Sequence, residues 1–265
     1  MIEFLLFMAR FLQILPVIDE KLRNRDKSML EFFLFVIVVL STNIIQGITG
    51  FAGTVLAMPF TILLFGIDVA KPSLTILTTL ACVLIVIRNF KNISWKTFFH
   101  MFVLMFIGVF IGEYLYHLFQ PSILLQIYAV FVICVAVSGL LKKKERSMPD
   151  SILSYIVVLA GIIHGMFISG GPLLIIYAVR KLPRKEEFRV TLSLIWISLN
   201  IYLMYKQFTN GLMTVSTLQT TALAIPALFA GVFIGGRLAG KMSQETFLKL
   251  TYILLVISGA TLLFN

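Results

Sequence analysis

Long apolar runs separated by short polar segments cover most of this 265-residue chain. The first run extends from Leu30 to Gly66, and Glu31 is its single charged side chain in 37 residues. A helix crosses the hydrocarbon core of a bilayer in about 20 residues, so this run is too long for one span. Three glycines, Gly47, Gly50 and Gly53, interrupt its middle. The pattern predicts two helices separated by a glycine turn.

Later runs extend the same pattern to the end of the chain. They cover roughly 72–90, 98–119, 122–141, 152–182, 190–206, 216–240 and 246–264. The run 152–182 is again too long for one span and is again interrupted, by Gly165, Gly170 and Gly171. We therefore divide the chain into an N-terminal amphipathic segment with a polar linker, a first membrane repeat, a basic cytoplasmic linker and a second membrane repeat, at 1–28, 29–141, 142–151 and 152–265.

The two halves share three sequence matches in the same order. Gln46-Gly47 and His164-Gly165 precede the two breaks and are 118 residues apart, and the pentapeptide GVFIG occurs at 108–112 and again 123 residues later. Ser138-Gly139 recurs after 120 residues. Interrupted helices in corresponding positions of two repeats are typical of secondary transporters. We predict an all-α polytopic membrane protein of two repeated halves, each a glycine-broken helix followed by three transmembrane helices.

Basic residues bear on the orientation of the halves. Lys and Arg gather near 88–96, 142–146, 180–189 and 237–249 and are absent from 113–121 and 207–215. Cytoplasmic loops are rich in Lys and Arg. If each broken helix is a hairpin that returns to its entry side, all four basic clusters are cytoplasmic and the repeats are inverted; if each crosses once, the repeats are parallel. The charge rule favours the inverted repeat, although the basic segment 21–27 argues against it.

Composition excludes several functional classes. The chain is 59% hydrophobic and 13% charged, with a mean hydropathy of +1.00, whereas soluble domains are about 45–50% apolar and about 25% charged. It is therefore not a soluble enzyme, a disordered chain or a disulfide scaffold. The basic residues behind the net charge of +10 lie in the loops between apolar runs. We therefore expect the protein to contact the lipid bilayer and not nucleic acid. Whether it forms a homo-oligomer is left open by the sequence. The sequence has no cluster of His, Cys, Asp or Glu at the spacing of metal ligands and no phosphate-binding loop for ATP. We therefore expect no metal, no cofactor and no catalytic residues.

Candidate binding chemistry gathers at the two breaks. A helix that begins after a glycine turn directs unpaired N–H groups and its positive dipole end at the turn, which favours an anion. We expect the N–H groups of Gly53, Thr54, Gly170 and Gly171 to hold it. The alternative is that the glycines only permit close helix packing. The complete predicted substrate site is Gln46, Gly47, Thr49, Gly50, Gly53, Thr54, His164, Gly165, Ser169, Gly170, Gly171 and Asn200, whereas Arg88 and Glu113 are expected at the membrane interface.

These motifs resemble those of the sulfite exporter TauE/SafE family of bacterial membrane permeases. The segment 47–59 (GITGFAGTVLAMP) resembles the family's first glycine motif, and 161–171 resembles its second. The run 66–95, which includes Arg88, resembles the segment that follows the first motif. Asn200, Gly231, Gly235, Arg237 and Leu238 match its C-terminal half, so the resemblance spans about 30–264.

The resemblance implies a permease of the bacterial inner membrane for a small anion, with sulfite, sulfonates and related organosulfur compounds as the expected substrates. Alternating access between the two repeats is the expected mechanism. Two other functions stay open from the sequence. The first is an anion channel, and the second is a non-transporting membrane scaffold that binds a partner through its basic loops.

Overall fold

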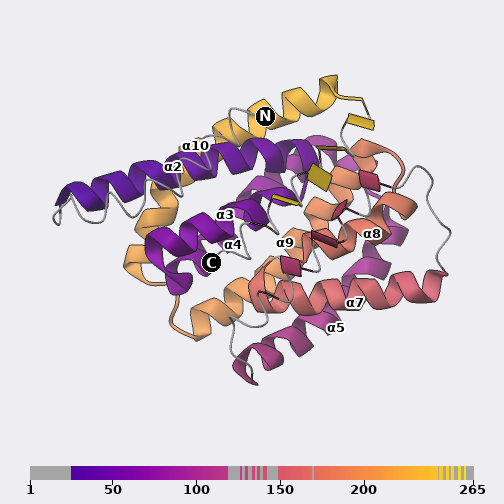
Figure 1. Cartoon of the computed structure of the whole chain (residues 1–265), viewed down its shortest axis with the longest axis horizontal. Helices are drawn as coiled ribbons and strands as arrows, with labels where there is room; N and C mark the ends of the chain where they lie inside the picture. Colours follow the sequence, from indigo (N-terminus) through magenta and orange to yellow (C-terminus); the bar gives the residue numbers. More distant parts are fainter. Residues whose placement is uncertain are drawn as a thin grey trace.

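The computed structural model describes residues 25–118, 149–168 and 170–243, together with parts of 126–141 and 245–260. Helices form nearly all of these residues, and no strand occurs among them (Figure 1). The elements with defined bounds are α2 (Arg25–Thr49), α3 (Ala52–Phe65), α4 (Ile67–Asn89), the short 3₁₀ helix η1 (Phe90–Asn92), α5 (Trp95–Leu118), α7 (Asp150–Phe167), α8 (Gly171–Lys181), α9 (Lys185–Thr209) and α10 (Val215–Lys241).

Helices α2 and α3 form a hairpin around the first glycine break. Gly50 adopts a φ of +83°, a conformation that favours glycine, and its N–H donates to the Gln46 carbonyl at 2.7 Å to end α2. The rings of Phe35 and Phe65 meet edge to face with centroids 5.3 Å apart. Because each of these residues lies 15 positions from the turn at Gly50, the chain returns along α2 toward the side from which it entered.

Helices α7 and α8 form the equivalent hairpin in the second half. Ile168 adopts the left-handed conformation, with a φ of 55°, and its N–H donates to the His164 carbonyl at 2.8 Å. Asp150, the first residue of α7, pairs with Lys181, the last residue of α8, at 2.8 Å. Both broken helices therefore return to their entry side. This is the alternative that places all four basic clusters on one face.

The two halves interlock through glycines. A Cβ atom added to Gly112 of α5 would lie 2.1 Å from the Ile162 carbonyl oxygen of α7, and one added to Gly235 of α10 would lie 2.1 Å from the Ile44 carbonyl oxygen of α2. Ile162 follows Ile44 by 118 residues and Gly235 follows Gly112 by 123, the offsets of the sequence matches. Each half thus packs its glycine-bearing helix against the broken helix of the other half.

The hairpins point in opposite directions. In Figure 1, α2 begins at one end of the molecule, whereas α7 begins at the other, and their turns lie between these ends. This arrangement supports the inverted repeat, which stays a prediction. The third spans expected in the two halves, at 122–141 and 246–264, lie partly outside the described residues. Those of their residues that the structure describes are helical.

The exterior and the lengths of the helices suit a bilayer. Among the residues that the structure describes, five helices are long and apolar enough to cross a membrane, at Met29–Thr49, Ile67–Asn92, Trp95–Tyr116, Lys185–Thr209 and Val215–Lys241. Exposed apolar side chains recur at helical spacing along α5, at Phe99, Val103, Phe110 and Tyr114. The prediction of an all-helical polytopic membrane protein is confirmed.

Candidate functional site

The turns of the two hairpins meet inside the helical bundle. A Cβ atom added to Gly171 would lie 3.1 Å from the Phe51 ring, so the two turns are in contact. A cavity of about 10 Å³ lies at this junction and is lined by Phe51, Thr54, Val55, Thr78, His164, Ile168, Gly171 and Trp196. One water molecule needs about 10–15 Å³. The structure therefore brings together three of the predicted residues, Thr54, His164 and Gly171, in a junction that is closed in this conformation.

Equivalent hydrogen bonds tie each hairpin to the helix that follows it. The Gln46 amide donates to the Cys82 sulfur of α4 at 3.3 Å, and the His164 imidazole bonds the Asn200 amide oxygen of α9 at 3.2 Å. His164 follows Gln46, and Asn200 follows Cys82, by 118 residues. The side-chain oxygen of Gln46 also accepts the N–H of Gly53 at 2.8 Å. That N–H group is therefore engaged within the protein rather than directed at a ligand.

The first turn is closed from the side of α9. The Trp196 indole N–H donates to the Gly50 carbonyl at 3.1 Å, and the buried Arg189 guanidinium donates to the Gly47 carbonyl. Thr49 stabilises the turn from within, since its hydroxyl accepts the Ala52 N–H at 3.2 Å. A cation at the last turn of α2 also opposes the negative end of that helix dipole.

Other predicted residues serve helix packing or lie outside the described residues. A Cβ atom on Gly47, Gly165 or Gly170 would lie 2.8, 2.5 or 2.3 Å from a neighbouring carbonyl oxygen. For these glycines close packing, the alternative interpretation of the sequence, accounts for the residue type. Ser169 lies outside the described residues.

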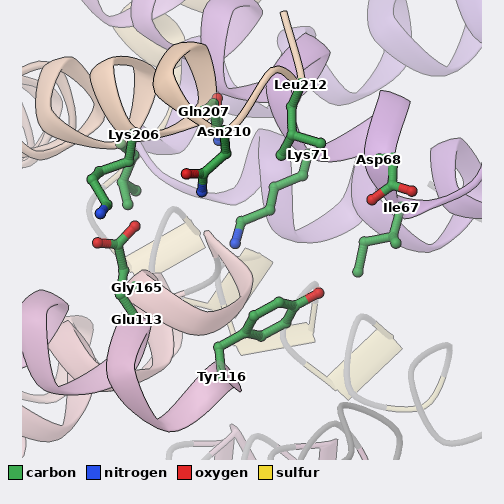
Figure 2. A pocket seen from close by; sticks show the side chains of 11 residues that line it. Ile67, Asp68, Lys71, Glu113, Tyr116, Gly165, Lys206, Gln207, Asn210 and Leu212 are labelled. Carbon is green, nitrogen blue, oxygen red and sulfur yellow. The ribbon is translucent and has the colours of Figure 1, made fainter. Parts of the chain in front are cut away.

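A larger cavity, hereafter the vestibule, has a volume of about 490 Å³. The residues that line it come from α4, α5, α7, α9 and the segment after α9, and they are Ile67, Asp68, Lys71, Glu113, Tyr116, Gly165, Leu203, Lys206, Gln207, Asn210 and Leu212 (Figure 2). Its rim includes 113–116 and 207–212, the face without basic clusters, which the charge rule assigns to the outside. Gly165 lines the vestibule, and the preceding residue, His164, lines the cavity at the closed junction, so the two cavities are adjacent along α7.

Two cations occupy equivalent positions at the two breaks. Arg189 follows Lys71 by 118 residues. Arg189 bonds the Gly47 carbonyl, whereas Lys71 faces the vestibule beside Gly165, the equivalent of Gly47. Within the part of the chain that the structure describes, the Lys71 ammonium has no hydrogen-bond acceptor or ion pair and lies 4.5 Å from the centre of the Tyr116 ring.

Lys71, Lys206 and Gln207 were not predicted as site residues from the sequence, and Glu113 was expected at the membrane interface. Each of these residues lies within one or two helical turns of the end of an apolar run. Polar side chains are common there, so residue type alone does not distinguish them from loop residues. The offset of 118 was the usable signal, because it aligns Lys71 with Arg189.

Comparison with known proteins identifies the family. Residues 34–262 match the model of the sulfite exporter TauE/SafE family. The chain is 24% identical over 177 residues to the probable inner membrane transporter protein TsaS of Comamonas testosteroni, an alignment that covers 66% of this chain and 74% of that protein. No solved structure matches the chain. The chain therefore belongs to the sulfite exporter TauE/SafE family and is a multi-pass transporter of the inner membrane.

Proposed function

We propose that the protein carries a small anion, such as sulfite, a sulfonate or a related organosulfur compound, by alternating access through the junction of the two hairpin turns. The observation that carries this proposal is the contact between Phe51 and Gly171, which joins two oppositely directed hairpins beside a vestibule that opens on one face. Transporters built from inverted repeats bind their substrate where the broken helices meet.

The junction offers groups that suit an anion. Helices α3 and α8 both begin there, and the positive end of each helix dipole favours a negative charge at the junction. The Thr54 hydroxyl bonds the Thr78 hydroxyl across the cavity, and the Trp196 and His164 rings lie 4.9 Å apart. Opening of the junction by rocking of one half against the other would admit the substrate between these groups.

The two cations account for closure of each face in turn. In this conformation Arg189 bonds the turn of the first hairpin, and the Phe51 and Phe188 rings meet with centroids 6.3 Å apart, so the basic face is closed. In the opposite state of the transport cycle, the contact of Arg189 with Gly47 is broken and the equivalent contact of Lys71 with Gly165 is formed. Lys71 would then donate to the Gly165 carbonyl and close the vestibule.

Replacement of Gly171 by alanine tests the junction directly. The added methyl group would press on the Phe51 ring, which can give way, so the protein should fold while the space for an anion is lost. We expect anion exchange in proteoliposomes to fall at least about tenfold, equivalent to ~1.4 kcal/mol. Gly240→Ala is the matched control, because nothing lies within 4 Å of a Cβ atom at that position. Normal exchange by Gly171→Ala would contradict the proposed site.

A thermal-stability panel identifies the anion. We expect one sulfur oxyanion among sulfite, thiosulfate, methanesulfonate, sulfoacetate and sulfate to raise the melting temperature saturably, with acetate and chloride as comparisons. At 100 times its dissociation constant, a ligand stabilises the folded state by about 2.7 kcal/mol. Exchange that saturates with concentration separates this transporter from a channel, whose flux would not saturate.

A further inference from the structure

The vestibule contains an acidic side chain among cations. Glu113 of α5, Lys71 of α4 and Lys206 of α9 all extend into it, and Figure 2 shows Lys206 and Glu113 directed toward one another. Glu113 lines the same cavity as Lys71 and accepts the Tyr202 hydroxyl at 2.9 Å. Charged groups at the depth of a membrane span are costly and mark the paths of ions and protons.

A polar group beside these charges lacks a partner. Gln207 is 4% exposed, and its side-chain amide nitrogen donates to the Thr75 hydroxyl at 3.0 Å. Its amide oxygen is buried without a hydrogen-bond donor among the described residues. A buried acceptor at the wall of a cavity is satisfied by water or by a protonated ligand. The wall of the vestibule is therefore built to contact hydrogen-bond donors as well as anions.

An anion that enters this space competes with Glu113 for the same ammonium groups. The charged and titratable groups that line the vestibule with Glu113 are Asp68 and Lys71 of α4, Tyr116 of its own helix and Lys206 of α9. Tyr202 of α9 donates to Glu113, and Gly165 of α7 is part of the same lining. Two cations and two carboxylates balance one another. An added anion leaves one negative charge in excess, and like charges that are shielded from water repel strongly.

We propose that the vestibule binds the transported anion together with one proton, with Lys71 and Lys206 holding the anion and Glu113 taking up the proton. This inference rests on the proposed anion transport and names its coupling ion. The proton comes from the outer solution and restores neutrality around the anion. The class of substrate is a small anion with several oxygen acceptors, such as a sulfonate, which can accept hydrogen bonds from two ammonium groups at once.

Proteoliposomes that contain a pH-sensitive dye test the coupling. Two measurements are made with sulfite, thiosulfate and methanesulfonate: exchange, with anion on both sides, and acidification of the lumen during net uptake. We expect Glu113→Gln to retain exchange and to lose the acidification that the unaltered protein shows. The amide keeps the shape of the side chain and an acceptor for Tyr202. Passive entry of acid is the same in both preparations and cancels in the comparison.

A second variant and a control keep the interpretation specific. Tyr202→Phe removes the hydroxyl that donates to Glu113 but keeps the carboxylate, so it should retain the acidification that Glu113→Gln loses. Glu187→Gln is the control, because Glu187 pairs with Arg184 at 3.2 Å, outside the vestibule. It should leave exchange and acidification unchanged.

Each further outcome has a distinct meaning. Acidification that persists in Glu113→Gln would overturn the coupling role while the anion transport stands. Loss of exchange by Glu113→Gln at an unchanged melting temperature would also overturn it, because Glu113 would then be needed for the anion itself. No exchange of any of the three anions by the unaltered protein would overturn the proposed function and this inference together.

Discussion

Replacement of Gly235 by alanine is expected to force α10 away from α2 and to lower the free energy of unfolding by about 3 kcal/mol or more. The reason is geometric, since a Cβ atom at this position would lie 2.1 Å from the Ile44 carbonyl oxygen, and backbone on both sides must move to relieve the contact. In a bilayer, close approach of helix backbones is a main source of association between helices. Thermal unfolding in detergent measures the loss.

Two further variants make this prediction specific. Gly112→Ala should cost about as much as Gly235→Ala, because its Cβ atom would lie at the same 2.1 Å from the equivalent carbonyl oxygen, that of Ile162. Gly240→Ala, on the same helix as Gly235 but with open surroundings, should be neutral or slightly stabilising, since alanine favours helix over glycine by about 0.5–1 kcal/mol. Equal stability of Gly235→Ala and Gly240→Ala would contradict the interlocking of the halves.

Replacement of Arg189 by methionine is expected to open the basic face of the protein. Arg189 is 8% exposed, and its guanidinium donates to the Gly47 carbonyl at the end of α2. A hydrogen bond from a charged group contributes about 1.5–3 kcal/mol. Loss of this contact should shift the population toward the state in which the first turn is accessible. The thiol of Cys82, buried beneath Gln46, then becomes accessible from that face.

Alkylation of Cys82 in inverted membrane vesicles, in a variant that lacks Cys134, measures this opening. A shift of 1.5–3 kcal/mol corresponds to a rate increase of about tenfold to a hundredfold. Arg184→Met is the matched control, because Arg184 is exposed and pairs with Glu187 at the surface, where a salt bridge contributes about 1 kcal/mol at most. Equal alkylation rates in the two variants would show that Arg189 does not close this face.

Much of the fold could be predicted because glycine and apolar runs have direct structural consequences. The breaks at Gly50 and Gly170 were located from residue type, and the repeat followed from the offset of 118 between Gln46 and His164. Helix α3 begins at Ala52 and α8 begins at Gly171, within two residues of these breaks. The direction of α3 was left between two alternatives, because the sequence does not contain the contact between Phe35 and Phe65.

The candidate site was less predictable, because polar residues near run ends can face either lipid headgroups or the protein interior. Arg189 was counted with a basic loop cluster, yet α9 already begins at Lys185, so Arg189 is inside the bundle. Cys82 is buried and its sulfur accepts the Gln46 amide, a contact that the residue type alone does not indicate. Such roles depend on which helix lies opposite, and an apolar pattern does not specify that.

The reciprocal packing of the halves sets an order on biosynthesis. When the ribosome has released the first half, Gly112 of α5 and the Ile44 carbonyl of α2 both lack the surfaces that they meet in the finished protein, since those surfaces belong to α7 and α10. The side of α2 that packs against Gly235 of α10 therefore contacts lipid until α10 has been inserted. Final packing is thus a late event that follows synthesis of nearly the whole chain, and truncation before α10 leaves α2 without its partner.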